Sequence, residues 1–194
     1  MRFLTVAAGL LALSGLSAVT VARAEQPDSI SYCHGYGCKL RTTIHFSGAD
    51  MQRLKSIVAA GGSSAKAERM ALGKADQWYE RISGAQSGTS HDEAKGAFSD
   101  AYNAAQLDCI DESTNTTTLL KLIEKRGWLK YHKVGRPSAR GLLFDLRYPH
   151  NTAVVIETDS REAWVIDSWI PANAEFPDIM PLAVWKTKGV RGQD

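Results

Sequence analysis

The sequence predicts an α+β domain in which N-terminal helices and a cysteine-bearing helix pack on a small antiparallel sheet. Three observations lead to this class. Apolar residues recur at helical spacing between residues 49 and 126, and shorter strand-like runs follow from residue 128. Between these two parts a well-capped helix begins beside Cys109. The first 24 residues resemble an export signal, so the folded part is expected to meet an oxidising compartment.

The predicted signal peptide spans residues 1–24. Arg2 supplies its positive start, residues 3–21 are apolar, and Ala22-Arg23-Ala24 is a small-x-small cleavage site. A retained membrane anchor is the alternative, but small and polar residues interrupt a run already short for a span of about 20 residues. We therefore expect a periplasmic or secreted protein whose residues 25–194 form one domain.

The charge balance argues against nucleic acid or an anionic membrane as a partner. The chain has 23 basic and 21 acidic side chains, and removing Arg2 and Arg23 leaves 21 of each. A near-neutral domain has no basic field to attract a polyanion. The expected partner is a protein or peptide substrate, without stable membrane insertion once the signal is removed.

Three cysteines in an exported chain leave one without a partner. Cys33 and Cys38 flank a glycine-containing tetrapeptide that can turn tightly, which favours a disulfide between them. Cys109 is then the free thiol. A metal site formed by Cys33, His34 and Cys38 is an alternative, but the spacing is not that of a zinc finger and no fourth ligand is evident.

Three helices are expected before the one that carries Cys109. In each of them apolar residues share one face, as Met51, Leu54 and Val58 do in the first. Residues 25–48, ahead of these helices, are predicted to be an irregular segment that contains the disulfide loop. The expected helices span residues 49–60, 65–82 and 91–105.

The helix beside Cys109 has clear start and stop signals. Asp108 is a suitable N-cap, because its carboxylate can accept from the unpaired N–H groups of the first turn. Gly127 marks the C-terminal end. A cysteine at a helix N-terminus can have its pKa lowered from about 8.5 to about 3.5–7.5. Backbone N–H groups at this end could stabilise an oxyanion, and Gln106 could add a side-chain donor.

The chain after this helix has the periodicity of strands. A hairpin near the end brings two polar residues into register. If its turn is centred on Thr158 and Asp159, His150 lies directly opposite Asp167 on the same face, close enough for a carboxylate to orient an imidazole. Prolines then hold the C-terminal segment in an extended path, before a short helical turn that docks Trp185. The expected strands span residues 128–134, 142–146, 151–156 and 161–167.

A thiol, an imidazole and a carboxylate complete the set needed for acyl transfer. At these residues the chain resembles the transglutaminase-like cysteine peptidase superfamily, especially its bacterial periplasmic branch. The resemblance rests on Asp108-Cys109-Ile110-Asp111, on residues 150–155 and on residues 164–167, and it covers roughly 107–169. It implies a papain-like fold and a triad of Cys109 as nucleophile, His150 as base and then acid, and Asp167 as orienting group.

The resemblance also implies the reaction. It points to hydrolysis or acyl transfer at a peptide or isopeptide amide through a thioester. Some periplasmic members bind calcium through acids that flank the cysteine, but Ile110 stands where the second acid would be, so we expect no cofactor and regard calcium as disfavoured. The alternative is a catalytically inactive binding or assembly module of the envelope on the same fold.

Overall fold

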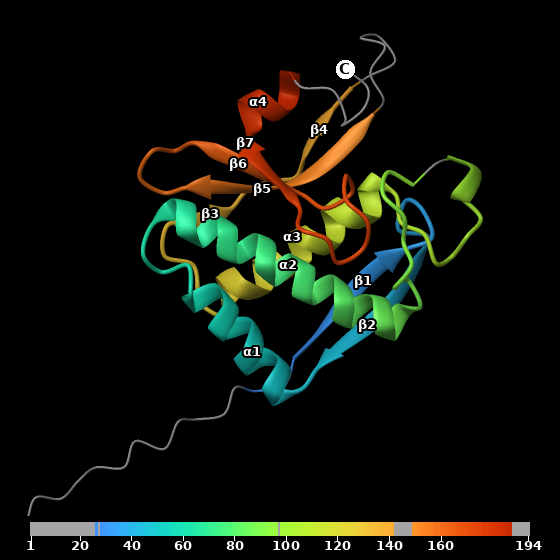
Figure 1. Cartoon of the computed structure of the whole chain (residues 1–194), viewed down its shortest axis with the longest axis horizontal. Coiled ribbons are helices and arrows are strands. Elements are labelled where there is room, and N and C mark those ends of the chain that lie inside the picture. The colour runs from blue at the N-terminus through green and yellow to red at the C-terminus, as the bar shows by residue number, and fades with distance from the viewer. Residues whose placement is uncertain (1–25, 27, 97, 142–148, 188–194) are drawn as a thin grey trace, which may run out of the picture.

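The computed structural model describes residues 26, 28–96, 98–141 and 149–187, and it has the expected α+β architecture (Figure 1). Its elements run in the order β1 (Asp28–His34), β2 (Leu40–Phe46), α1 (Gly48–Ala59), α2 (Ala65–Ser87), the 3₁₀ turn η1 (Phe98–Asp100), α3 (Cys109–Lys125), β3 (His132–Val134), β4 (Ser138–Arg140), β5 (His150–Glu157), β6 (Ala163–Asp167), β7 (Asp178–Pro181) and α4 (Leu182–Thr187).

Two antiparallel sheets make up the β part. Strands β1 and β2 form a separate hairpin, while the larger sheet has the order β3-β5-β6-β7, with β4 also paired to β5. β5 is therefore a central strand that pairs with three others. Its first residue is His150, and the neighbouring strand β6 ends at Asp167, so both polar residues lie at the same end of the sheet.

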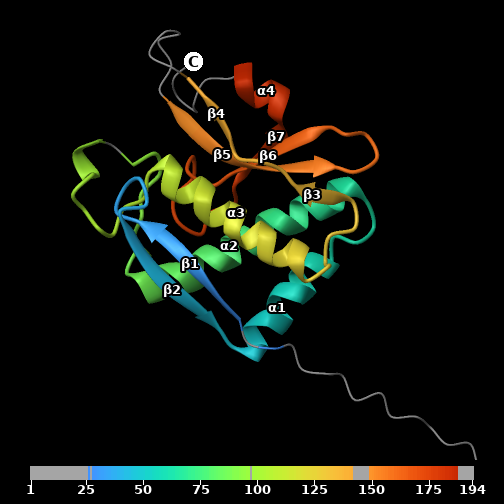
Figure 2. The same ribbon diagram turned by 180° about the vertical axis from the view of Figure 1, so that it is seen from behind.

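Helix α3 lies between the two sheets. In both ribbon views α2 and α3 cross one face of the larger sheet, and the β1–β2 hairpin lies on the far side of α3 (Figures 1 and 2). The main apolar core fills this space and draws on α1, α2, α3, both hairpins and β5; Met51, Leu72, Leu119 and Val155 are among its fully buried members. Such burial on both sides fixes α3 against β5.

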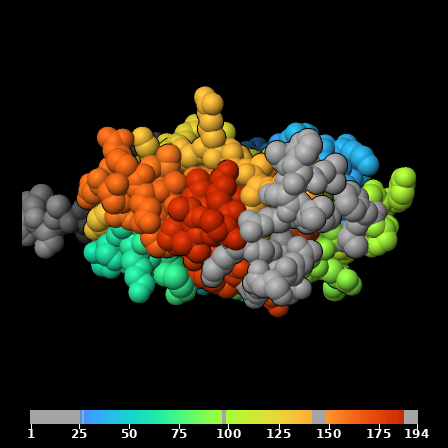
Figure 3. Space-filling view, turned by 90° about the horizontal axis from the view of Figure 1, so that it is seen from above, coloured from blue at the N-terminus to red at the C-terminus, as the bar shows by residue number. Residues whose placement is uncertain are grey.

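The other face of the larger sheet carries α4. There Val154, Val165 and Trp185 form a second apolar cluster. Seen from above, α4 and the β5–β6 hairpin form a continuous part of this surface (Figure 3). The expectation that a short C-terminal turn docks Trp185 agrees with the structure, since this side chain is only 2% exposed.

Two sequence predictions about the first half of the chain are wrong. Residues 25–48 are not an irregular segment, because β1 and β2 pair along their whole length from Asp28↔Phe46 to His34↔Leu40. Residues 91–105 do not form a helix. The segment instead follows an irregular path around η1, and it is held by tertiary bonds such as Lys95 N–H to the Trp169 carbonyl and Leu107 N–H to the Asp92 carboxylate.

The remaining helices and strands match the prediction more closely. Helix α2 is longer than expected and ends at Gly88, whose φ of 83° gives the usual left-handed cap. β4 and β7 were not predicted, because both are short. The predicted signal peptide at 1–24 and the predicted strand at 142–146 lie outside the described residues.

The described residues contain no helix with the length and apolar character needed to cross a bilayer. They do contain the predicted Cys33–Cys38 disulfide. This bond fits a protein that folds in an oxidising compartment.

Candidate active site

The start of α3 is fixed by its cap. Asp108 Oδ1 accepts from the N–H groups of Ile110 at 3.0 Å and Asp111 at 2.9 Å, and the Asp111 side chain reaches back to the Asp108 N–H. This reciprocal capping box leaves Cys109 as the first helical residue. Within the described part of the chain the backbone N–H of Cys109 makes no hydrogen bond.

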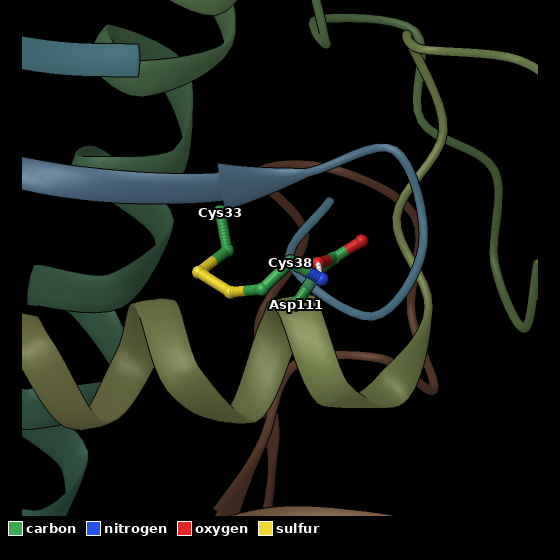
Figure 4. Close-up of side chains that lie close together, drawn as sticks. All are labelled: Cys33, Cys38 and Asp111. Atoms are coloured by element: carbon green, nitrogen blue, oxygen red, sulfur yellow. Dashed lines mark hydrogen bonds between the residues drawn. A yellow bond between two sulfur atoms is a disulfide. The ribbon is translucent and has the colours of Figure 1, made fainter. Parts of the chain in front are cut away.

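The disulfide loop forms hydrogen bonds with the same end of the helix. Residues Gly35, Tyr36, Gly37 and Cys38 all have positive φ, so successive N–H groups point to one side. The N–H groups of Tyr36 and Cys38 donate to the Asp111 carboxylate at 2.8 and 2.6 Å. Figure 4 shows Asp111 extending from α3 toward this loop. The disulfide therefore closes a carboxylate-binding turn that holds the helix carrying Cys109.

The loop does not suit a metal ion. The ligand atoms of Cys33, Cys38 and Asp111 lie within 4.8 Å of one another, but the two sulfurs are bonded together and the carboxylate accepts from backbone N–H groups. Both ring nitrogens of His34 are also engaged, by the Ala104 carbonyl and the Thr42 hydroxyl. The proposed zinc-type site thus lacks the thiolates it needs.

Calcium fits no better at the helix start. Asp108 uses Oδ1 for the cap and Oδ2 to accept from the Gly37 N–H at 2.9 Å. The flanking Ile110 offers no oxygen from its side chain. Asp108 is thus engaged in protein hydrogen bonds, and Ile110 supplies no second side-chain ligand.

His150 and Asp167 meet, although the predicted register is wrong. The structure pairs Val154 with Val165 and Ile156 with Ala163, so the partner opposite Asp167 falls at residue 152. This shift moves the partner by two residues and so keeps both side chains on one face. His150 Nε2 reaches Asp167 Oδ2 diagonally at 2.7 Å, and both side chains are buried.

Two tryptophans enclose the imidazole. The rings of Trp169 and Trp185 lie 4.5 and 5.4 Å from it, centroid to centroid. Trp185 Nε1 also donates to Asp167 Oδ2 at 2.7 Å, so this oxygen accepts two hydrogen bonds. Because a carboxylate only accepts, the imidazole proton lies on Nε2. His150 Nδ1 has no hydrogen-bond partner within the described residues.

The Cys109 sulfur lies beside the residues that flank His150. It is 3.9 Å from the Pro149 carbonyl oxygen and 3.8 Å from Asn151 Nδ2, and its side chain packs with Trp169 and Ile170. Trp169 therefore packs against the imidazole and belongs to the same apolar cluster as Cys109. No hydrogen bond joins the sulfur to His150 among the described residues.

The environment of the thiol opposes its ionisation. Burial raises the pKa of Cys109, the hydrogen bonds from Asn151 lower it, and the Asp108 and Asp167 carboxylates raise it further. This direction is opposite to the lowering expected from the helix N-terminus. Burial therefore favours the neutral thiol in the resting site.

Gln106 does not face this site. Its Nε2 donates to the His91 carbonyl at 2.9 Å and its Oε1 accepts from the Glu93 N–H at 3.0 Å. Both ends of the amide therefore hold the 91–106 loop in place, and we assign it a structural role. The sequence reasoning missed Asn151 and Trp169. Asn151 directly follows His150, and Trp169 lies two residues beyond Asp167. This proximity in sequence to two predicted site residues could have identified both.

Comparison of the chain with protein-family models, with curated proteins and with solved structures gives no match.

Proposed function

We propose that the protein is an exported cysteine hydrolase or acyltransferase of the transglutaminase-like type, with a papain-like fold, that acts on a peptide or isopeptide amide. The observation that carries the proposal is the buried His150–Asp167 pair, 2.7 Å apart, on a strand start where the residues on either side of His150, Pro149 and Asn151, contact the Cys109 sulfur. The predicted export signal, the disulfide and the position of the thiol at a helix N-terminus support the same assignment.

The proposed roles follow from proton positions. Asp167 holds the proton of His150 on Nε2, which leaves Nδ1 as the base that removes the Cys109 proton. The sulfur then attacks the amide carbonyl carbon, and the thioester forms as the amine leaves with the proton from His150. Water or an amine attacks the thioester in the second half of the cycle. Because the thiol is neutral at rest, its proton is transferred as the attack occurs.

The test first measures the reactivity of the Cys109 thiol and then looks for cleavage of peptide amides. In the unreduced protein, iodoacetamide should label one cysteine, Cys109. Incubation with a mixed library of peptide amides, followed by mass spectrometry, should then show cleaved or transamidated products. Cys109→Ala should lose these products while keeping the wild-type melting temperature. Full product formation by Cys109→Ala would disprove the proposal.

A catalytically inactive envelope binding module is the second candidate. It is favoured by the raised pKa of Cys109 and by the missing hydrogen bond between its sulfur and His150. The pH dependence of iodoacetamide labelling separates the two. Labelling that falls off below about pH 8.5, as for an unassisted thiol, supports the binding module, whereas labelling that persists below pH 7 supports the enzyme.

A further inference from the structure

The side-chain amide of Asn151 lies next to the Cys109 sulfur. Gln106, which was predicted to supply such an amide, does not reach this position. Asn151 Nδ2 donates to the Cys109 sulfur at 3.8 Å, from the strand residue that follows His150. The backbone of Asn151 is held in the sheet, where it pairs with Ala139 of β4. The amide thus approaches the sulfur from a rigid strand, and the unused N–H of Cys109 approaches it from the helix.

We propose that the Asn151 side-chain amide is the second donor of an oxyanion hole whose first donor is the backbone N–H of Cys109. This inference rests on the proposed function and extends it to a further catalytic residue. Two donors from different elements, both within reach of one sulfur, are the arrangement that acyl transfer requires.

The chemistry explains why a donor beside the sulfur matters. When the sulfur bonds to the carbonyl carbon, the π electron pair of the carbonyl moves onto oxygen, and the thiol proton passes to His150 Nδ1. The charged oxygen is attached to the carbon that the sulfur has attacked, so a donor in contact with the sulfur is within reach of that oxygen. Return of the electron pair expels the leaving group, which takes the proton from His150.

The local environment increases the value of this donor. Cys109 is 7% exposed, and a hydrogen bond to a developing charge is stronger where water is excluded. The hydrogen bonds of Asn151 also act against burial in setting the pKa of Cys109. The same amide would therefore assist the thiolate first and the oxyanion next.

Two reactions of Cys109 test the proposal without knowledge of the natural substrate. Acylation by p-nitrophenyl acetate passes through an oxyanion, whereas alkylation by iodoacetamide does not. Both are followed at Cys109 by mass spectrometry, with Cys109→Ala as the background. In Asn151→Ala the ratio of acylation to alkylation rate should fall by about 10²–10³-fold, the usual loss for one oxyanion donor.

Two further variants control for folding. Asn151→Asp keeps the shape of the side chain but replaces the donor with an acceptor, and it should show the same fall in the ratio. Asn103→Ala removes an amide from a loop, where its side chain only accepts from the Ala105 N–H, and should leave the ratio unchanged. Circular dichroism and melting temperature establish that each variant is folded.

The outcomes separate the two proposals. An unchanged ratio in both Asn151 variants overturns the role of Asn151 and leaves the proposed function standing. If wild-type Cys109 is acylated no faster than the same cysteine in urea-unfolded protein, the proposed function fails, and the oxyanion donor fails with it. Fast wild-type acylation with a reduced ratio in both variants supports the donor.

Discussion

Two buried histidine–carboxylate pairs in this molecule have almost the same description and different surroundings. His132 Nδ1 lies 2.8 Å from Glu68, and His150 Nε2 lies 2.7 Å from Asp167; in each pair the side chains are 0% and 2% exposed. Distance and burial alone therefore do not distinguish the pair of the candidate site from the other pair. The difference lies in the second nitrogen of each ring.

The second nitrogen of His132 is used. Its Nε2 accepts from Arg69 at 3.1 Å, and the same guanidinium group binds Glu157 at 2.7 Å and lies 3.6 Å above the Trp164 ring. Every polar atom of this ring has a partner, so the network joins α2 to β3, β5 and β6. Such closed networks stabilise one packing arrangement.

The second nitrogen of His150 has no hydrogen-bond partner among the described residues, and the Cys109 sulfur contacts the residues on either side of His150. A buried polar atom without a partner lowers stability, so each one calls for an explanation. The two pairs thus differ in the second ring nitrogen and in the thiol near the chain around His150, and it is this difference, not the ion pair, that distinguishes the candidate site.

The most direct test of this difference is to substitute each histidine in turn. His150→Gln should lower the rate of Cys109 acylation at pH 7 by about 10²–10⁴-fold, since general-base catalysis typically contributes that much. His132→Gln should leave the rate per folded molecule unchanged and lower the melting temperature by several degrees. Equal losses of rate in the two variants would show that the site assignment is wrong.

The second test addresses the closed network. Glu68 accepts from the N–H groups of Lys130 and Tyr131 as well as from His132. Glu68→Ala should therefore lower the unfolding free energy by about 3–5 kcal/mol in urea titrations, the usual cost of breaking a buried pair. Glu157→Ala is the matched control, because this partly exposed partner of Arg69 should cost less. If the Glu68 variant is no less stable than this control, the network is not structural.

The sequence predicted the helix that carries Cys109 and the disulfide because both depend on local chemistry. The Asp108 cap, the terminal Gly127 and the glycine loop between Cys33 and Cys38 act over a few residues. The meeting of His150 and Asp167 was also predicted, but from the wrong register. It was found because a two-residue shift leaves strand faces unchanged.

The failures have tertiary causes. Residues 91–105 show helical spacing at Phe98 and Tyr102, yet Tyr102 is 97% exposed, and long-range bonds to Trp169 and Leu107 hold the segment in another path. The β1–β2 hairpin was not predicted because its connecting turn has left-handed backbone angles and is held by hydrogen bonds to Asp111, which is distant in the sequence. No local sequence pattern indicates such a turn. The contact between Asn151 and Cys109 depends on how α3 packs against β5, which local sequence patterns do not determine.

A third test compares two carboxylates on α2. Burial raises the pKa of Asp76 to about 7, in a cluster with Glu80 and Glu112. Burial also acts to raise the pKa of Glu68, but hydrogen bonds from His132, Lys130 and Tyr131 outweigh it and the pKa is lowered. The folded state thus holds a proton on Asp76 that the unfolded state loses near pH 4. Asp76 contributes stability at acidic pH that is lost as pH rises toward 7. The contribution of Glu68 has the opposite pH dependence, because its pKa is lowered and its stabilisation is lost as pH falls.

The expected result is a fall in unfolding free energy between about pH 4 and 7, with Asp76 contributing a slope of about 1.4 kcal/mol per pH unit. Asp76→Asn should flatten this fall and raise stability at pH 8, whereas Thr116, which donates to Asp76, can be changed to Ser as a conservative control. Urea titrations at each pH supply the measurement. A variant that follows the wild-type pH curve would mean that Asp76 is ionised in the fold.

The smallest expected effect separates two functions of Trp185. Its ring packs beside His150, and its Nε1 donates to the oxygen of Asp167 that binds the imidazole. Trp185→Phe keeps an aromatic ring and removes the donor, so the Asp167 carboxylate should hold the imidazole less firmly. Because a hydrogen bond to a charged group is worth about 1.5–3 kcal/mol, we expect acylation to slow by about tenfold or more. Trp164→Phe removes an indole in the network around Arg69 and should leave the acylation rate unchanged. A Trp185→Phe rate equal to that of Trp164→Phe would mean that the carboxylate is oriented by the fold alone, and that the indole acts on His150 only through packing.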